Sequence, residues 1–140
     1  MATESDHTLA KESATLAGQL LLLLRDAAKG AQITSETLGK IADKRSHELL
    51  HKIISDVSPS DAILSEEQED NLERLDSDRV WIIDPLDGTR EFEETGRADW
   101  AVHVALAESG IPTVGAVAIP SMGITFCSAD TPTIHKEISE

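Results

Sequence analysis

Apolar residues recur at steps of three and four over residues 8–29, which is the spacing of one face of an α-helix. The positions that carry this repeat are Ala10, Ala14, Ala17, Leu21, Leu24 and Ala28. Gly30 follows as a typical stop signal, so the pattern predicts a long amphipathic helix. Leu20, Leu22 and Leu23 widen the apolar stripe, which indicates that this helix packs against more than one neighbour.

A second helix is predicted from about residue 45 to residue 57, after a segment of weak periodicity over residues 31–44. Its core positions are Leu50, Ile53, Ile54 and Val57. Asp43 stands just before it, where a carboxylate can accept hydrogen bonds from the free amides of the first turn. His47 and His51 lie four residues apart on this helix. We interpret them as surface or half-buried histidines, because no third soft metal ligand stands near them in the sequence.

Beyond the helices the pattern changes to short apolar runs, several with a period of two, which indicate β-strands. These runs cover residues 61–65, 80–83, 100–107, 113–119 and 124–128. The run 80–83 is apolar throughout and is predicted to be buried on both faces. The last three runs are separated by short turns and predict an antiparallel meander. The fold class expected is therefore α+β, with long helices packed on an antiparallel sheet. Residues 129–140 show no convincing core pattern.

Composition adds limits on location and partners. The 140 residues suit one compact domain, and a formal net charge of −14 argues against binding to nucleic acid or to an anionic membrane surface. The longest leucine run, residues 20–24, is far shorter than the roughly 20 residues of a membrane-spanning helix. Cys127 is the only cysteine, so no intrachain disulfide can form, and a cytoplasmic location is expected. We interpret Cys127 as a buried structural thiol.

The chemistry of the chain is concentrated where the run 80–83 ends in two carboxylates, Asp84 and Asp87. Pro85 between them fixes its own φ and favours an extended conformation for Asp84. Gly88 lets the backbone approach a ligand, and its amide with that of Thr89 can open a helix whose N-terminus favours an anion. Two acids beside such a turn indicate metal-assisted phosphate chemistry, although a capped tight turn is the alternative reading of the same residues.

The stretch Trp-Ile-Ile-Asp-Pro-Leu-Asp-Gly-Thr at residues 81–89 closely resembles the signature of the inositol monophosphatase superfamily of Mg²⁺-dependent, lithium-sensitive phosphatases. The continuation Arg-Glu-Phe at residues 90–92 is similar to the branch that contains the CysQ type of 3'-phosphoadenosine 5'-phosphate phosphatase. The resemblance implies a sugar-phosphatase-like N-terminal domain.

The resemblance implies a set of metal ligands for Mg²⁺: Glu66, Asp84, the carbonyl of Leu86, and Asp87. The family has a Glu-Glu pair after the strand at residues 61–65, whose first Glu reaches a metal and serves catalysis while the second, here Glu67, supports it nearby. The alternative for this pair is that it merely begins a solvated acidic loop reaching to residue 78.

Three further residues receive roles from the resemblance. Asp43 matches an Ala-Asp motif whose Asp helps to orient the attacking water, and it would act with Thr89. The step from Asp43 to Glu66 is similar to the family's spacing, which favours this role over that of a helix cap. The amides of Gly88 and Thr89 would hold the substrate phosphate. Apart from the resemblance, the strand pattern puts His103 on the small-residue face of its strand, where a structural hydrogen bond or a helix contact is expected rather than catalysis.

In that family a second domain supplies another metal-ligating Asp in a Trp-Asp motif, together with most residues that grip the substrate. Here Trp81 is followed by Ile82 and Trp100 by Ala101, so that motif does not occur. We therefore expect residues 1–140 to be the N-terminal metal-binding domain of a two-domain phosphatase, with the C-terminal domain absent. An apolar face left uncovered makes a homodimer one expectation.

The leading expectation for function is hydrolysis of the 3'-phosphate of 3'-phosphoadenosine 5'-phosphate, or of its phosphosulfate, by metal-activated water in the intact enzyme. The alternatives are inositol monophosphatase or fructose-1,6-bisphosphatase activity and, from another class, an inactive metal-binding or dimerisation fragment. The expected partner is a small phosphorylated substrate, with no nucleic acid and no membrane.

Overall fold

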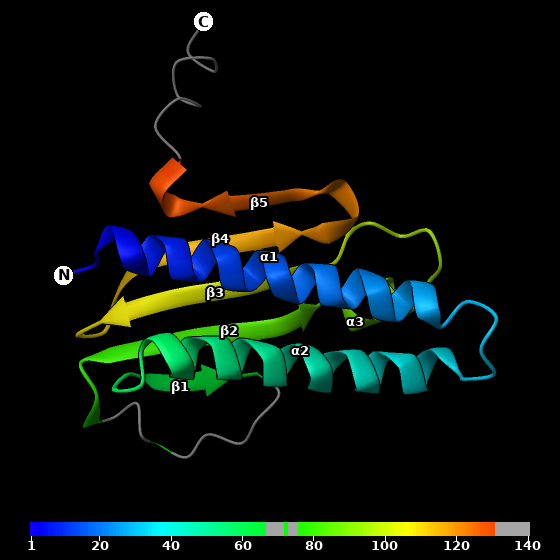
Figure 1. Cartoon of the computed structure of the whole chain (residues 1–140), viewed down its shortest axis with the longest axis horizontal. Helices are drawn as coiled ribbons and strands as arrows, with labels where there is room; N and C mark the ends of the chain where they lie inside the picture. Colours follow the sequence, from blue (N-terminus) through cyan, green and yellow to red (C-terminus); the bar gives the residue numbers. More distant parts are fainter. Residues whose placement is uncertain (67–71, 73–75, 131–140) are drawn as a thin grey trace, which may run out of the picture.

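The computed structural model describes residues 1–66, 72 and 76–130, and within them two long helices lie against one face of a five-stranded sheet (Figure 1). The helices are α1 (Glu4–Ala27), α2 (Ser35–Val57) and the short α3 (Thr89–Glu93). The strands are β1 (Ala62–Ser65), β2 (Arg79–Asp87), β3 (Ala101–Glu108), β4 (Ile111–Ile119) and β5 (Ile124–Cys127). Two 3₁₀ turns, η2 (Pro120–Met122) and η3 (Ser128–Asp130), flank β5.

Both long helices begin earlier than the hydrophobic pattern predicts. At α1 the side chain of Thr3 accepts a hydrogen bond from the amide of Asp6 while the Asp6 carboxylate accepts one from the amide of Thr3, a reciprocal cap that fixes the helix start. At α2 the cap is Thr34, whose side chain accepts from the amide of Thr37. Asp43 therefore lies well inside α2, and its interpretation as a helix cap is wrong.

The early part of α2 has weak periodicity because small residues form its buried face. Gly39 and Ala42 take positions that larger apolar residues usually fill, and they are buried together with Leu38, Ser46 and Leu50. Small side chains give little hydrophobic signal, yet they allow close packing against other elements. The sequence pattern consequently underestimates the length of this helix by about three turns.

The strands follow one another across the sheet in the order β1-β2-β3-β4-β5. β2 to β5 are antiparallel, which confirms the predicted meander, but β1 runs parallel to β2, so the sheet is mixed. The α+β class with helices on a sheet is confirmed. The parallel pair could not be predicted, because a period of two reports which face a residue takes and not the direction of the neighbouring strand.

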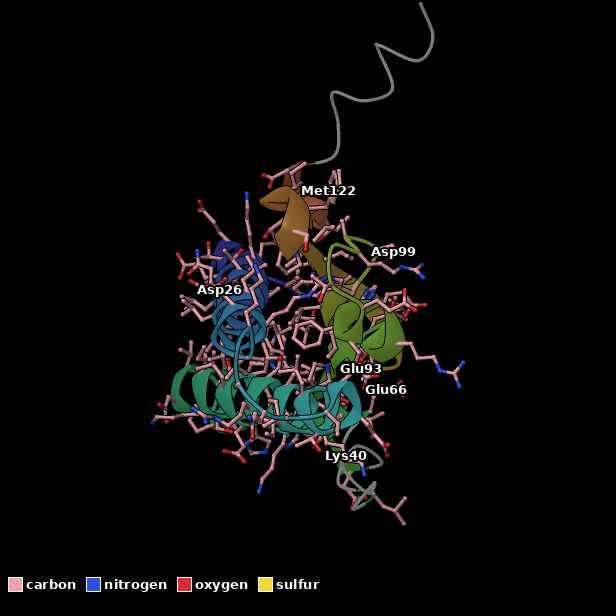
Figure 2. The ribbon with its side chains drawn as sticks, turned by 90° about the vertical axis from the view of Figure 1, so that its right-hand side faces the viewer. Asp26, Lys40, Glu66, Glu93, Asp99 and Met122 are labelled. Carbon is pink, nitrogen blue, oxygen red and sulfur yellow. The ribbon has the colours of Figure 1, made fainter. Side chains whose placement is uncertain are left out.

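The core lies between the helices and the sheet, where α1 packs on β3, β4 and β5 and α2 packs on β2. Trp81 and Ile83 of β2 are fully buried on that side, as are Val102 and Leu106 of β3. Cys127 is buried, as expected. The opposite face, which we call the open face, is not covered by any described helix (Figure 2). Burial of residues 80–83 on both faces is therefore wrong for Ile82, which is 39% exposed.

Register places one row of paired residues across the open face: Asp84, His103, Val117 and Phe126. Residues that face each other in neighbouring strands point to the same side of a sheet, so a carboxylate, an imidazole and two apolar side chains share this row. None of the described helices is both long enough and apolar enough to span a bilayer. Of the tail over residues 129–140, Ala129 and Asp130 belong to η3, and Asp130 pairs with Lys11 over 2.7 Å. Residues 131–140 lie outside the described residues.

Candidate metal and phosphate site

The candidate site lies at the edge where β1 and β2 end side by side and the short α3 begins (Figure 1). In the parallel pair Ser65 faces Ile83, so the next residue, Glu66, comes beside Asp84. The Glu66 amide donates a hydrogen bond to the Ile83 carbonyl over 3.2 Å, which continues the pairing by one residue. Parallel pairing thus brings together two predicted ligands that are 18 positions apart in the chain.

The carboxylates of Asp84 and Asp87 both belong to β2, although the strand is irregular between them. Asp84 faces His103 across the antiparallel pair and Asp87 faces Ala101, so the register shifts over the two residues between them. Without that shift, residues three apart in a strand would point to opposite faces. The irregularity turns the Asp87 carboxylate towards His103, whose Nε2 lies 2.9 Å from Asp87 Oδ2. The predicted hydrogen bond of His103 is confirmed.

The negative charge of Asp84 is destabilised by its surroundings at this edge of the sheet. Burial raises the pKa of Asp84, and the neighbouring carboxylate of Asp87 raises it further. His103 acts in the opposite direction, Glu66 adds to the rise, and the Leu86 amide lowers the pKa by a hydrogen bond. The net pKa of Asp84 is above its ordinary value of 3.8, so these acids repel one another in the protein as it stands.

The backbone between the two acids is anchored from the helix side. Ser46 of α2 is fully buried and its Oγ donates to the Pro85 carbonyl over 2.7 Å. Leu86 inserts its side chain into the core, with 3% exposed. Ser46 was not among the predicted site residues. Its signal in the sequence is a polar side chain at a buried position of the α2 stripe, which requires a hydrogen-bond partner.

Asp43 and Thr89, predicted to act together, are in contact. Thr89 Oγ1 donates to Asp43 Oδ2 over 3.4 Å, across the packing of α2 on α3. Gly88 precedes α3 with φ +87°, the left-handed region, and no side chain caps the helix at that residue. A Cβ on Gly88 would lie 3.2 Å from the Asp99 carbonyl oxygen and 3.3 Å from Trp100 Cβ, so a larger residue would be crowded here as well as strained in φ.

The approach of α2 to α3 depends on Gly39, which sequence reasoning missed. A Cβ at this position would collide with the Glu93 side chain and lie 2.9 Å from Thr89 Cγ2. A glycine inside a helix costs about 1 kcal/mol relative to alanine, which is the signal that could have found it. Its absence of a side chain allows Thr89 to reach Asp43.

Arg25, in the last turn of α1, supports α3 and the loop after it. Its guanidinium donates to the carbonyls of Glu94 and Arg97 and lies 5.5 Å from the ring centroids of both Phe92 and Trp100. Desolvation by burial lowers the pKa of Arg25, but an arginine stays charged at any ordinary pH. The contacts hold the end of α3 against the core. This role has no local signal, because Arg25 is remote in sequence from the residues it binds.

The donor set fits a hard divalent cation in its chemistry. Carboxylate and carbonyl oxygens are the ligands that Mg²⁺ prefers, and a cation would offset the repulsion that raises the pKa of Asp84. Within the described residues, however, no three Asp, Glu, His or Cys side chains are gathered as a ready metal site. Figure 2, which looks onto this end of the molecule, shows Glu66 close to the outer edge. Glu67 lies outside the described residues.

The contacts of His47 and His51 agree with their interpretation as surface or half-buried histidines. His47 is half-buried and its Nδ1 lies 2.8 Å from Ser65 Oγ, which ties α2 to the end of β1 beside Glu66. His51 is exposed and contacts Ser55 on its own helix. His47 therefore contributes to the position of the candidate site through the strand that carries Glu66.

Comparison with known proteins agrees with the fold and with the sequence motif. The model of the inositol monophosphatase family matches residues 3–132, and the chain belongs to this family. It is 48% identical over 125 residues to a 3'-phosphoadenosine 5'-phosphate phosphatase of Mycobacterium bovis, covering 84% of this chain and 45% of that protein. It is 30% identical over 118 residues to the 3'(2'),5'-bisphosphate nucleotidase CysQ of Escherichia coli O157:H7, covering 81% of this chain and 48% of that protein.

A solved structure, the extragenic suppressor protein suhB from Bartonella henselae, superposes with a TM-score of 0.73 at 26% identity, over 86% of this chain and 46% of that one. The resemblance predicted from residues 81–92 is confirmed by these comparisons. Phosphatases of the family generally depend on metal ions and act on small phosphorylated substrates. The chain spans about half the length of the curated relatives it matches.

Proposed function

We propose that this chain is the N-terminal metal-binding domain of a Mg²⁺-dependent phosphomonoesterase. The observation that carries the proposal is that β1 and β2 end side by side, which puts Glu66 next to Asp84, while the Asp87 carboxylate is near enough to raise the pKa of Asp84. The short α3 and the glycine before it lie at the same end of β2. The substrate we propose is 3'-phosphoadenosine 5'-phosphate or its phosphosulfate, which would lose its 3'-phosphate. Support for this choice comes from the names of the relatives in Mycobacterium bovis and Escherichia coli.

Glu66, Asp84, the Leu86 carbonyl and Asp87 are the groups that would hold the ion. The chemistry that bound Mg²⁺ supplies to phosphate-ester hydrolysis is charge neutralisation, activation of water and stabilisation of the leaving oxygen. Glu67 would support Glu66. The Ser46 hydrogen bond to the Pro85 carbonyl anchors the backbone between the two aspartates to α2.

Thr89 and Asp43 would orient the attacking water. Since the Thr89 hydroxyl donates a hydrogen bond to Asp43 Oδ2, its oxygen lone pairs point away from Asp43 and can accept a hydrogen bond from a water. Asp43 thereby fixes the direction of an acceptor and does not need to touch the substrate. The amides of Gly88 and Thr89 would bind the phosphate, and the left-handed conformation of Gly88 lets the phosphate approach the backbone.

We also propose association of two copies through the open face. Ile124 and Phe126 of β5 are 40% and 52% exposed, and Ile82 of β2 is similarly exposed. Exposed apolar side chains on one sheet face favour burial against another surface. The single, buried Cys127 is compatible with a reducing cytoplasm, which we propose as the location.

The test is phosphate release by the protein with Mg²⁺, measured side by side on 3'-phosphoadenosine 5'-phosphate, inositol 1-phosphate and fructose 1,6-bisphosphate. Release from the nucleotide that exceeds the other two and falls with Asp87→Asn or Thr89→Ala is expected, and lithium should inhibit it. The matched control is Asp26→Asn, an exposed acid of α1 whose ion pair with Lys29 is remote from the site.

Preference for inositol 1-phosphate or fructose 1,6-bisphosphate would replace the nucleotide by the corresponding alternative substrate. Mg²⁺ binding without release from any of the three would favour the other alternative, a metal-binding or dimerisation fragment. This second function is favoured by the fact that the chain covers only 45% of the Mycobacterium bovis relative.

A further inference from the structure

His103 stands beside the proposed metal ligand Asp87 because of the pairing of β2 with β3. Its Nε2 lies 2.9 Å from Asp87 Oδ2, within the range of a charge-assisted hydrogen bond. Both side chains remain partly accessible, with 40% of the His103 side chain and 59% of the Asp87 side chain exposed. The bond is therefore formed at the open face, at the edge that a cation would approach.

The surroundings of His103 offer it few other partners. Its neighbours on the same face of the sheet are Ala101 and Ala105 of its own strand, Val117, which faces it from β4, and Asp84, which faces it from β2. Within the described part of the chain, Asp87 is the side chain to which His103 is hydrogen-bonded. His103 therefore lies beside two carboxylates and is hydrogen-bonded to one oxygen of Asp87, so it is placed to act on that carboxylate.

A carboxylate with one oxygen held by an N–H group presents its other oxygen in a fixed direction. Groups that orient metal ligands in this way usually change metal affinity by about 10- to 100-fold when they are removed. We propose that His103 is a positioning residue, whose Nε2–H holds Asp87 Oδ2 so that Oδ1 is directed to the divalent cation. This inference rests on the proposed function, in which Asp87 is a ligand.

The competing reading is that the contact only joins β2 to β3. The two readings differ in what restores function. Glutamine at position 103 keeps a donor of similar reach, because its Nε2 can occupy nearly the place of the imidazole Nε2, whereas alanine removes the donor. A joint between strands would show in the free energy of unfolding without metal, while positioning would show in the metal affinity.

The experiment is calorimetric titration of the full chain with Mg²⁺, and separately with Mn²⁺, for the unmodified protein, His103→Ala and His103→Gln. Urea unfolding without metal and circular dichroism are measured on the same samples. We expect His103→Ala to raise the Kd for Mg²⁺ about 10- to 100-fold, and His103→Gln to recover most of the affinity. His51→Ala, which removes an exposed histidine of α2, is the matched control and should leave the Kd unchanged.

An unchanged Kd in His103→Ala overturns the proposal, as does a loss of affinity that His103→Gln fails to recover. Asp87→Asn, titrated in parallel, separates this failure from that of the proposed function. If Asp87→Asn weakens Mg²⁺ binding and His103→Ala does not, only the positioning role is lost. If Asp87→Asn binds Mg²⁺ as well as the unmodified chain, the proposed ligand and the role of His103 are both overturned.

Discussion

At its first residue β2 presents Arg79 to carboxylates from three other parts of the chain, whereas at its last residues it presents Asp84 and Asp87 to one another. The ion pairs of Arg79 run from Nη2 to Asp6, from Nε to Asp61 and from Nη1 to Glu108, over 2.8, 3.1 and 3.0 Å. The three carboxylate side chains are at most 12% exposed. Acids that lose this much water need a matching cation, and the chain supplies one.

Among the described residues, the acids at the opposite end of the strand have no such match. His103 is the group that the structure places against Asp87, and the pKa of Asp84 is raised by burial and by its acidic neighbours. Both ends belong to one strand in one fold, so the difference reflects the side chains that surround each end. A cluster neutralised from within serves stability, while a cluster left with repulsion is suited to an external cation.

Arg79→Met tests whether the ion pairs at the first residue of β2 stabilise the fold, because it removes the cation and keeps a side chain of similar length. Three nearly buried carboxylates would then lose their arginine, although Glu108 would keep its ion pair with the Met1 amino group and Asp61 its hydrogen bond from Trp81. We expect a loss of about 2 to 3 kcal/mol in the free energy of unfolding, below the ~3–5 kcal/mol for a fully buried pair because solvent reaches Arg79. The loss in the free energy of unfolding is measured by urea denaturation of the unmodified chain and of the variant.

The matched control for Arg79→Met is Arg97→Met, at an exposed arginine that pairs with Glu94 and Asp99. It should shift the urea midpoint little, since exposed ion pairs contribute little to stability. Equal losses in the two variants would show that the Arg79 cluster is no more than a surface network.

Gly39→Ala tests how the other end of β2 is assembled. Alanine would gain about 1 kcal/mol of helix propensity, but overpacking against Thr89 and Glu93 costs about 1 to 3 kcal/mol. We expect a net loss of stability near 1 kcal/mol, together with a loss of phosphate release as Thr89 moves from Asp43. Gly115→Ala is the control, because a Cβ there meets nothing within 4 Å. Full activity in Gly39→Ala would show that phosphate release does not depend on the close packing of α2 on α3 at this glycine.

The smallest expected effect concerns acid pH. Burial acts to raise the pKa of Asp6, but the hydrogen bonds from Arg79 and from the Thr3 amide outweigh it, so the pKa lies below its ordinary 3.8. A lowered pKa means stability that is present above about pH 4 and is lost as the pH falls through the folded-state value. Unfolding followed from pH 6 to pH 2 should therefore show a steeper acid loss in the unmodified chain than in Asp6→Asn. Identical profiles would show that Asp6 contributes no such linkage.

The two ends of β2 also differ in how far the sequence predicts them. The acids, the glycine and the threonine of the site are contiguous and form a motif, so their resemblance to a family and the meeting of Asp84 with Asp87 could be predicted. The Arg79 cluster could not, because its members lie at positions 6, 61, 79 and 108. Only the fold brings them together, and no periodicity reports which strand lies beside which.

The same limit explains the remaining differences around the site. The apolar run places β1 correctly, but the expectation of an antiparallel sheet is wrong for this strand, and its parallel direction puts Glu66 beside Asp84. The pattern misses the start of α2 because Gly39 and Ala42 carry little apolar signal. For the same reason a helix cap stood as the alternative role for Asp43. The contacts of Ser46, Arg25 and His103 depend on side chains meeting across elements, which the sequence alone does not specify.

Binding of a divalent cation at the acidic end of β2 is tested most directly by the effect of Mg²⁺ on the stability of the protein. Urea unfolding of the unmodified chain and of Asp87→Asn is measured with and without Mg²⁺. This separates the effect of charge repulsion on stability from the effect of metal binding. Without metal, Asp87→Asn should fold at least as well, because it removes a charge that raises the pKa of Asp84. With metal, the midpoint of the unmodified chain should rise by mass action while that of Asp87→Asn stays nearly constant. An equal rise in both proteins would contradict the claim.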